Sequence, residues 1–416
     1  MPEGDLLAPP ICRLCGARLK HSFLDLGLTP IASAFVTPEL AASGDEPLYP
    51  LHARVCDSCL LVQIDAVVAP EMLLADYTYY SSYSLGWVEQ ARRFAVAMQA
   101  RLGLGPASLV IEIASNDGYL LQHFKAAGVP VLGIDPAINV AQAALARGVP
   151  TEIAFFDADT APVIARQRGQ ADLVVANNVL EHVPDIAGFV GGLPLLLRPE
   201  GVASFEFPHL LRLIEGVQFD TIHHENYAYL SLLVVERVLA QAGLRVFDVE
   251  TLPSQGGSLR VLACHRGASH CEAPGLAAVR AQEAAAGLHR PETYDGFAAR
   301  VRAVTEAFHD FIAETQDQGR RVAAYGAAAK GSSFLNACGV TQAEILCVAD
   351  RNPAKRGRLM PGSHIPIVSP DALAAADPDD LLILPWNLRE EIAPQLYALR
   401  GRGCRIWVAI PGLQTV

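Results

Sequence analysis

Two Cys-x-x-Cys pairs, Cys12/Cys15 and Cys56/Cys59, most constrain what the first part of this chain can form. Four thiolates in two such turns make a closed tetrahedral site, and zinc is the metal that favours it. Forty residues lie between the pairs, so one ion would cross-link a module too small for a stable core of its own. Since four thiolates leave no open position, this zinc would be structural. The alternative is four unrelated buried thiols.

The composition indicates a well-packed globular protein. Of 416 residues, 51% are hydrophobic and 18% are charged, and the net charge is −12. An acidic chain is poorly suited to phosphate backbones, so nucleic acid is not an expected partner. Neither a signal peptide nor an apolar run long enough to span a bilayer is evident, which predicts a cytoplasmic protein without membrane contact and with reduced thiols. We expect a monomer or a weak homo-oligomer.

Beyond the cysteine module, short apolar runs alternate with amphipathic stretches, which predicts parallel sheets flanked by helices. The expected strands lie at residues 109–113, 131–135, 173–176 and 202–207 and, in a last domain, at 322–325, 344–348, 381–384 and 404–408. Residues 266–318 between the two sets have helical spacing. The predicted fold class is α/β, with a small zinc-binding N-terminal domain (1–72), a central Rossmann-like domain (73–290) and a C-terminal Rossmann-like domain (291–416).

The turn at residues 112–118, after the first central strand, indicates a nucleoside site, because ligands of doubly wound sheets bind at the carboxyl ends of strands. Dinucleotide sites need G-x-G-x-x-G, but only Gly118 is a glycine here, so the turn suits a ligand without pyrophosphate, such as S-adenosylmethionine. Asp135 offers a carboxylate to both ribose hydroxyls. The alternative is an ordinary strand–turn–helix corner. The expected cofactor-binding residues are Glu112, Ala114, Asn116, Asp117, Gly118, Asp135, Phe156, Asn177 and Asn178.

Two polar segments offer acid/base groups. Glu181 and His182 follow a buried strand, and a second segment contains His223, His224 and Glu225. Imidazoles titrate near neutral pH, so acid/base chemistry is the leading interpretation. A metal site is disfavoured, because adjacent residues on a strand face opposite ways and no third ligand is obvious. A structural or surface role is the other alternative.

The loop at residues 325–333, after the first strand of the last domain, favours a phosphate ligand. Small residues let a ligand approach the backbone, a helix N-terminus adds partial positive charge, and Lys330 adds a full charge. The loop lacks the GxxxxGK[ST] pattern of a Walker loop. A sugar-nucleotide diphosphate is the expected guest, and tight helix–strand packing is the alternative. Asp350 and Asn387 follow later strands and would line the same crevice.

Together these segments resemble the sugar C-methyltransferase family, which acts on nucleotide-linked 4-keto-deoxysugars. The resemblance is carried by the cysteine pairs and by residues 26–32, 77–84, 112–118, 177–182, 255–260 and 325–333, in that order along nearly the whole chain. It implies a zinc-binding domain, an S-adenosylmethionine-dependent methyltransferase domain and a C-terminal Rossmann-like domain, with the sugar nucleotide between the last two. The implied reaction, in deoxysugar biosynthesis, deprotonates the carbon next to the ketone, usually C3, of an expected dTDP-linked substrate and methylates the enediolate.

One departure from the family pattern concerns the base. Family members usually read Tyr-His-Glu-His where residues 223–226 read His-His-Glu-Asn, and the last His is the favoured base, a role that Asn226 cannot fill. We expect one of the two adjacent histidines to take the proton, Glu225 to orient it, and His182 or Tyr77 to steady the oxyanion. The expected catalytic residues are thus His223, His224, Glu225, His182 and Tyr77. The expected substrate-binding residues are Tyr79, Ser82, Asn226, Tyr229, Arg260, Tyr325, Lys330, Gly331, Ser332 and Asn387.

Three rival interpretations remain. An O- or N-methyltransferase acting on a sugar or small natural product would need no acidic C–H bond. An NAD-dependent redox enzyme would use the last domain, but the Gly326-x-x-x-x-Gly331 loop lacks the dinucleotide spacing. A non-catalytic, zinc-stapled scaffold is the reading that Asn226 favours.

Overall fold

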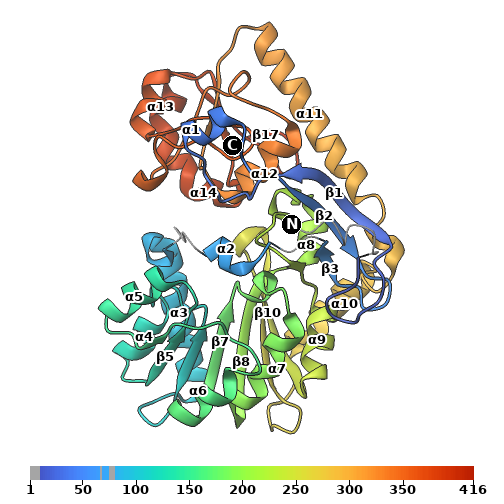
Figure 1. Cartoon of the computed structure of the whole chain (residues 1–416), viewed down its shortest axis with the longest axis vertical. Coiled ribbons are helices and arrows are strands. Elements are labelled where there is room, and N and C mark those ends of the chain that lie inside the picture. Colours follow the sequence, from blue (N-terminus) through green and yellow to red (C-terminus); the bar gives the residue numbers. More distant parts are fainter. Residues whose placement is uncertain (1–9, 66–67, 75–79) are drawn as a thin grey trace.

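The computed structural model describes residues 10–65, 68–74 and 80–416, and it confirms the predicted α/β fold class. Three sheets of four, seven and six strands form its framework. In Figure 1 the central sheet lies at the bottom, the C-terminal part at the top, and the N-terminal sheet beside the junction of the two. Within the described ranges, no helix has the length and apolar character needed to cross a membrane.

The N-terminal sheet takes its last strand from the middle of the chain. It contains, in spatial order, β1 (His21–Thr29), β2 (Tyr49–Val55), β3 (Val62–Ile64) and β9 (Ala228–Tyr229). All three pairings are antiparallel, and Val62 is the register partner of Tyr229. The cysteine module and the polar segment around residue 223 are therefore joined through one sheet. The helices of this part are α1 (Pro38–Ser43) and α2 (Pro70–Leu74).

The central sheet is parallel except at β11, which runs antiparallel to both neighbours. Its order is β10 (Leu244–Leu252), β11 (Ser258–His265), β8 (Leu197–Pro208), β7 (Ala171–Asn177), β4 (Val110–Ile113), β5 (Val131–Ile134) and β6 (Thr151–Glu152). The chain proceeds from β4 to β5 on one side and to β7 on the other, so the strand order reverses at β4. Such a reversal opens a ligand crevice at the carboxyl ends of the strands.

Helices cover both faces of this sheet (Figure 1). The helices of this part are α3 (Leu85–Leu102), α4 (Leu121–Ala126), α5 (Ile138–Ala146), α6 (Ala161–Arg168), α7 (Ile186–Leu196), α9 (Leu232–Gln241), α10 (Pro274–Ala285) and, at the junction with the other parts, α8 (Leu210–Glu215). The four strands predicted in this part correspond to β4, β5, β7 and β8, with ends that differ by a few residues. Their buried apolar side chains explain why the sequence pattern located them.

The C-terminal sheet reverses its order at β12, so its crevice opens there and at β15. The order is β14 (Ile367–Val368), β13 (Val348–Ala349), β12 (Val322–Tyr325), β15 (Asp380–Ile383), β16 (Arg405–Val408) and β17 (Gln414–Thr415). Its helices are α12 (Ala329–Cys338), α13 (Pro370–Ala376), α14 (Arg389–Ile392) and α15 (Tyr397–Gly401). The prediction of a strand at residues 344–348 is wrong in its start. The strand begins only at Val348, because residues 342–344 form a turn.

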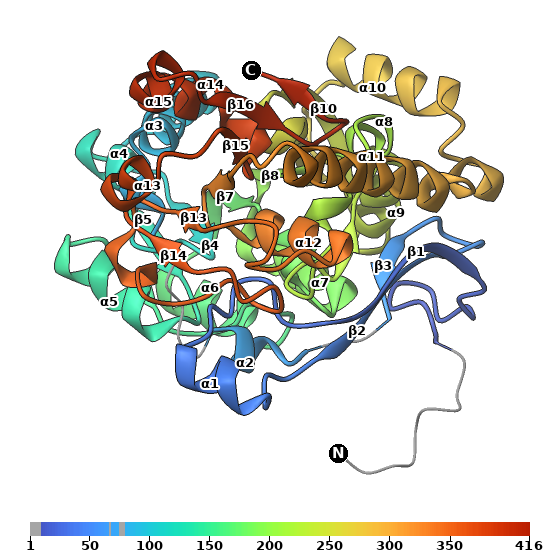
Figure 2. The ribbon, with the colours of Figure 1, turned by 90° about the horizontal axis from the view of Figure 1, so that it is seen from above.

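The long helix α11 (Phe297–Asp317) connects the C-terminal part to the rest and confirms the helical connector predicted from spacing. Figures 1 and 2 show it running along the C-terminal part toward β1. Its first residue, Phe297, stacks on Phe23 of β1 with ring centroids 4.4 Å apart. Nearer its other end, Phe308 packs edge-on against Phe334 of α12 at 4.9 Å. The apolar face of α11 is thus shared between the N-terminal sheet and the C-terminal part.

The central and C-terminal parts also meet at Trp386, in the 3₁₀ helix Trp386–Leu388. Its indole Nε1 donates to Asp220 Oδ2 at 2.7 Å. The ring packs on Gly256, where an added Cβ would lie 2.3 Å from the ring atom Cη2 and where φ is +87°. Only glycine satisfies both requirements, so Gly256 lets the two domains approach closely at this point.

We predict that Gly256→Ala disrupts the contact between Gly256 and the Trp386 ring. A side chain at a positive φ and a clash with Trp386 should together lower the free energy of unfolding by about 2 kcal/mol or more. Urea denaturation followed by fluorescence measures the loss. Gly267→Ala is the matched control, because nothing lies within 4 Å of its added Cβ. Equal midpoints for the two variants would contradict the role of Gly256.

Candidate functional site

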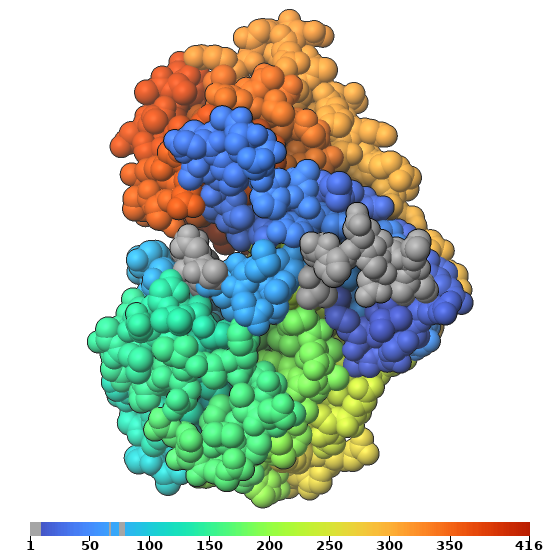
Figure 3. Space-filling view, in the orientation of Figure 1, coloured from blue at the N-terminus to red at the C-terminus, as the bar shows by residue number. Residues whose placement is uncertain are grey.

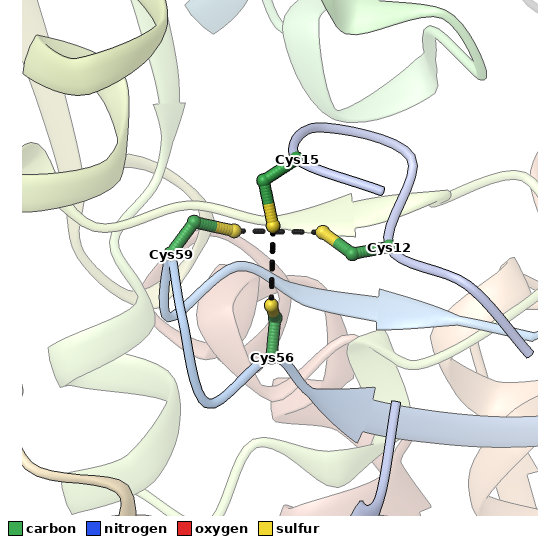
Figure 4. Close-up of side chains that lie close together, drawn as sticks. All are labelled: Cys12, Cys15, Cys56 and Cys59. Carbon is green, nitrogen blue, oxygen red and sulfur yellow. Dashed lines mark hydrogen bonds between the residues drawn. The ribbon is translucent and has the colours of Figure 1, made fainter. Parts of the chain in front are cut away.

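The four cysteines predicted to bind metal lie together at the edge of the N-terminal sheet (Figure 4). All four sulfur atoms lie within 4.8 Å of one another, with Cys12–Cys59 at 3.4 Å and Cys15–Cys56 at 3.5 Å. Zinc–sulfur bonds of about 2.3 Å in a tetrahedron place sulfurs about 3.8 Å apart. The cluster therefore fits a structural zinc ion.

Polar contacts tie this cluster to the rest of the molecule. Gln63 Nε2 donates to Cys12 Sγ at 3.1 Å, and its Oε1 accepts from the Arg13 backbone at 3.0 Å. The Arg13 guanidinium donates to the carbonyls of Ile64 and Tyr227, which lie on either side of the β3–β9 pairing. The hydrogen bond from the Cys59 thiol lowers the pKa of Cys12.

The predicted cofactor turn follows β4, and Asp135 fixes its shape. Asp135 Oδ2 accepts from the Asn116 backbone at 2.8 Å, and Oδ1 accepts from the Ala137 backbone at 2.9 Å. Ala114 and Asn116 adopt φ values of 54° and 50°, so the turn is strained without the glycines of a dinucleotide site. Burial raises the pKa of Asp135.

Several buried polar atoms around this crevice have no partner among the described residues. They are Glu112 Oε2, Asp117 Oδ1, Asn177 Oδ1, and both Oδ1 and Nδ2 of Asn178. Burial, followed by the nearby Asp135 and Asp117, raises the pKa of Glu112 well above its usual value. Unpaired buried polar atoms are costly and seldom left so in native proteins. Their convergence at the carboxyl ends of β4 and β7 indicates a polar ligand there.

Three other predicted residues lie around the same crevice. Phe156 is buried and packs edge-on against Phe189 at 5.3 Å. Gly118 closes the turn with φ of 78°. Ser82, predicted to bind substrate, instead donates its hydroxyl to Asp117 Oδ2 and accepts from Arg147 Nη2 at 2.8 Å. Ser82 therefore contacts the predicted cofactor turn through Asp117.

The central polar feature of the second segment is a His223–Glu225 pair. His223 Nδ1 lies 2.8 Å from Glu225 Oε2, and Asn226 Nδ2 lies 3.3 Å from His223 Nε2. Asn226 Nδ2 also donates to the Thr221 carbonyl at 2.8 Å, which holds the amide with its NH₂ toward the ring. Burial alone would raise the pKa of Glu225, but the charge and contact of His223, with the Ser33 hydroxyl, hold that pKa at about 2.

The neighbouring predicted residues face different surroundings. His224 is buried and its Nε2 donates to the Pro50 carbonyl at 3.2 Å, so its ring points into β2 and away from the pair. His182 Nδ1 donates to the Glu225 carbonyl at 2.6 Å, which joins the end of β7 to the pair. The hydroxyl of Tyr229 is buried without a partner among the described residues. Tyr77 and Tyr79 lie outside the described residues.

At the C-terminal crevice, Lys330 lies between two domains. Its Nζ donates to the Gln255 carbonyl at 3.4 Å and sits 5.2 Å from the centre of the Trp386 ring. Burial lowers the pKa of Lys330, and Asp220 opposes that shift. Burial raises the pKa of Asp220 to about 6, although Lys330 and Trp386 act in the other direction. One basic and one acidic side chain are thus held close together at the domain junction.

The remaining predicted substrate residues divide into two groups. The hydroxyl of Ser332 is buried without a partner in the described part of the chain, and Asn387 is half-buried beside Trp386. In contrast, Arg260 pairs with Glu206 and Glu250 at 2.8 and 3.0 Å, Tyr325 donates to Gln395 at 3.2 Å, and Gly331 packs against Leu384. The second group is engaged in internal contacts.

Sequence reasoning missed Ser33, and although it singled out the segments that contain Asp220 and Trp386, it did not relate these two residues to each other. Asp220 and Trp386 carry the domain contact, and Ser33 donates its backbone N–H and hydroxyl to Glu225 Oε1. The first two are 166 residues apart and the third lies 192 residues from its partner, so no local pattern relates them. The only signal for Ser33 was its place directly after the 26–32 segment that carries the family resemblance.

We predict that Cys56→Ser removes the metal and loosens the N-terminal part. Losing one of four thiolates leaves an incomplete site, so zinc content measured by mass spectrometry should fall from one ion per chain to near zero, with a lower melting temperature. Cys271→Ser, an exposed thiol outside the cluster, is the control and should keep full zinc. Unchanged zinc in Cys56→Ser would contradict the assignment of this cluster.

Comparisons with known proteins match three successive parts of the chain. Family models match residues 12–73 ("Putative zinc binding domain"), 87–249 ("Methyltransferase domain") and 253–411 ("C-methyltransferase C-terminal domain"). The C-methyltransferase NovU of Streptomyces niveus is 37% identical over 400 residues, covering 96% of this chain and 95% of NovU.

Other similarities are partial. A ubiquinone biosynthesis O-methyltransferase of Ralstonia nicotianae is 31% identical over 129 residues, which covers 30% of this chain and 48% of that protein. A solved methyltransferase of Burkholderia thailandensis, which acts on 1,6-didemethyltoxoflavin, is 19% identical with a TM-score of 0.36, covering 49% of this chain and 93% of that one. That TM-score is too low to add to the assignment. The match to NovU spans nearly both chains, and the chain therefore belongs to the C-methyltransferase family.

Proposed function

We propose that this methyltransferase adds a methyl group to a carbon next to the ketone of a nucleotide-linked 4-keto-deoxysugar, expected to be dTDP-linked. The observation that carries the proposal is the His223–Glu225 pair, which lies where the central crevice, the C-terminal part and the N-terminal sheet meet. Membership of the C-methyltransferase family favours a carbon acceptor, whose proton a base must remove. Two carbons flank a 4-ketone, and C3 is the expected one.

S-Adenosylmethionine is the methyl donor of the central domain, and when bound it supplies an electrophilic methyl group. The residues that would hold it are those whose polar atoms converge at the ends of β4, β5 and β7. We propose that Asp135, whose oxygens also accept the Asn116 and Ala137 backbone N–H groups, accepts ribose hydroxyls, and that Glu112 and Asn177 meet other polar groups of the ligand. Zinc in the four-cysteine cluster has a structural role, since four thiolates complete its coordination.

His223 is the residue that we assign as base. Its Nδ1 lies 2.8 Å from Glu225 Oε2, and neither atom has a hydrogen-bond partner among the described residues, which favours the tautomer with a proton on Nδ1 and a lone pair on Nε2. The Asn226 amide meets Nε2 at 3.3 Å, a weak contact that a substrate proton can replace. The carboxylate then stabilises the imidazolium that forms, as in other carboxylate–histidine pairs. His224 is not placed for this role, because its ring is held by the Pro50 carbonyl.

His182 is a second polar group beside the pair, and its hydrogen bond limits what it can do. Because Nδ1 donates to the Glu225 carbonyl, Nε2 of the neutral ring is an acceptor. His182 can therefore donate a hydrogen bond to a developing oxyanion only when Nε2 is also protonated, that is, as an imidazolium. The expected alternative donor is Tyr77. We propose that one of these two groups meets the ketone oxygen as charge develops on it.

The nucleotide would lie in the C-terminal crevice, at the ends of β12 and β15. Lys330 supplies a cation there, and the N-terminus of the ten-residue helix α12 supplies backbone N–H groups for a diphosphate. The buried hydroxyl of Ser332 offers one more donor. The contact between Trp386 and Asp220 holds this crevice against the segment that carries His223.

The test compares the wild-type enzyme with His223→Ala and His224→Gln. Each is incubated with S-adenosylmethionine and dTDP-4-keto-2,6-dideoxyglucose, and products are analysed by mass spectrometry and NMR. We expect a methyl group on a ring carbon next to the ketone, and a loss of at least about 100-fold in kcat for His223→Ala. His224→Gln carries an amide N–H at the reach of Nε2 for the Pro50 carbonyl and should stay within about tenfold of wild type.

Other outcomes separate the rival functions. A methyl group on oxygen or nitrogen would show an O- or N-methyltransferase. Full turnover by His223→Ala would show that His223 is not the base. Absence of product with several 4-keto-sugar nucleotides, together with absent S-adenosylmethionine binding in calorimetry, would indicate a non-catalytic protein. NMR assignment of the methylated carbon distinguishes C3 from C5.

A further inference from the structure

We propose that Ser33, a residue of the N-terminal domain, is a positioning residue for the base: it fixes the Glu225 carboxylate, which in turn orients His223. The inference rests on the proposed function, because it assigns Ser33 a role in the proton transfer proposed above. It gives the N-terminal domain a part in the reaction itself, beyond holding zinc.

The contacts divide the two oxygens of Glu225 between two domains. Oε1 accepts the Ser33 backbone N–H at 3.1 Å and also accepts the Ser33 hydroxyl. Oε2 faces His223 Nδ1 at 2.8 Å. With the Ser33 donors on one oxygen and the His223 ring close to the other, rotation of the carboxylate would break one of these contacts. Its plane, and with it the direction of the imidazole, is therefore set from the N-terminal domain.

Glu225 needs such donors, because only 16% of its side chain is exposed. A carboxylate taken out of water is stable only when its lone pairs are satisfied. Without the Ser33 hydroxyl, Oε1 would keep one backbone N–H, and the carboxylate would be free to turn toward other donors. The imidazole would then lose its fixed tautomer for part of the time.

The segment that carries Ser33 is held by the C-terminal part. We call residues 30–37 the strap. In it, Val36 exchanges backbone hydrogen bonds with Leu359 at 3.1 and 2.9 Å, and the Phe35 carbonyl accepts from Arg358 at 3.2 Å. Figure 3 shows the blue N-terminal segment that follows the strap seated on the orange C-terminal surface. The position of Ser33 is thus fixed by three parts of the chain together.

One lysine touches both the strap and the loop expected to hold the nucleotide. Lys355 Nζ lies 5.2 Å from the centre of the Phe35 ring and donates to the Ala327 carbonyl at 2.7 Å. Asp350 Oδ2 accepts from the Ala327 backbone at 2.9 Å and lies 3.4 Å from the same Nζ. Lys355 therefore contacts both the strap and this loop, and its contact in the strap, Phe35, is two residues away from Ser33.

The cavity that the His223 side chain lines is small. A cavity of about 10 Å³ is lined by Thr29, Pro30 and Ala32 from the N-terminal domain, by His223, and by Ser333 of α12. That volume is at the lower limit for one water molecule. The cavity therefore leaves the His223 ring little free space, which is consistent with a fixed orientation of the imidazole.

The test uses Ser33→Ala, Ser33→Thr and, as a control, Ser43→Ala in the full-length zinc-loaded enzyme. Ser43 is an exposed serine of the same domain whose hydroxyl bonds only nearby backbone. For Ser33→Ala we expect kcat to fall about tenfold with KM within about twofold, the value of one charge-assisted hydrogen bond. Ser33→Thr keeps the hydroxyl and should recover most of kcat, and Ser43→Ala should match wild type.

A readout that needs no substrate accompanies the kinetics. In ¹⁵N-histidine-labelled protein, the His223 signal should report a proton on Nδ1 in wild type and Ser33→Thr, and a mixture of tautomers in Ser33→Ala. Assignment comes from a His223→Gln sample. This spectrum tests the positioning role even if the proposed substrate is wrong, in which case all variants are inactive while the tautomer difference remains.

Three results would overturn the inference. The first is a Ser33→Ala enzyme with wild-type kcat and an unchanged His223 spectrum. The second is a rise in KM with unchanged kcat, which would make Ser33 a substrate contact. The third is an equal loss of kcat in Ser33→Ala and Ser33→Thr, which would show that the loss does not come from removing the hydroxyl. Zinc content and melting temperature are measured for each variant, so that unfolding is recognised.

Discussion

The rest of the site depends on how the segment at residues 219–229 is held. Asp220 accepts the indole N–H of Trp386, Glu225 accepts both donors of Ser33, and Tyr229 pairs with Val62 across β9 and β3. One end is thus fixed to the C-terminal part and the other to the N-terminal sheet. Buried charges such as Asp220 are tolerated only with close partners, so these contacts select one arrangement of the three parts.

In this arrangement the zinc cluster stabilises more than the N-terminal module, because it also supports the segment that carries the proposed base. Cys56 and Cys59 lie in the turn between β2 and β3, and β3 is the strand that pairs with β9. Arg13, between Cys12 and Cys15, reaches the carbonyl of Tyr227, just before β9. Zinc bound to these four cysteines thus stabilises a sheet whose last strand, β9, follows the proposed base His223 in the chain. Loss of zinc would disturb the site although zinc takes no part in chemistry.

The sequence was sufficient for the features that rest on local pattern. The four cysteines come together as their spacing predicts, and the central strands β4, β5, β7 and β8 were found because buried parallel strands are continuous apolar runs. The family resemblance was confirmed by the comparison with NovU. The roles of the individual site residues stay predictions.

What the sequence could not provide are contacts between distant segments. The two-residue strand β9 has no pattern of its own and exists because β3 is there to pair with it. No sequence pattern shows that Ser33 contacts Glu225 or that Trp386 contacts Asp220, because the fold alone brings these residues together. Similarly, Arg260 and Ser82 resembled substrate ligands, and only the structure shows the ion pairs and hydrogen bonds that engage them.

The central claim is that the His223–Glu225 pair removes a proton from carbon, and solvent exchange tests it most directly. The keto-sugar nucleotide is incubated in heavy water with enzyme but without methyl donor, and deuterium at each ring carbon is followed by NMR. The account predicts enzyme-dependent exchange at one carbon next to the ketone, abolished in His223→Ala and slowed in Glu225→Gln. Exchange at the wild-type rate in both variants would place the base elsewhere and contradict the account.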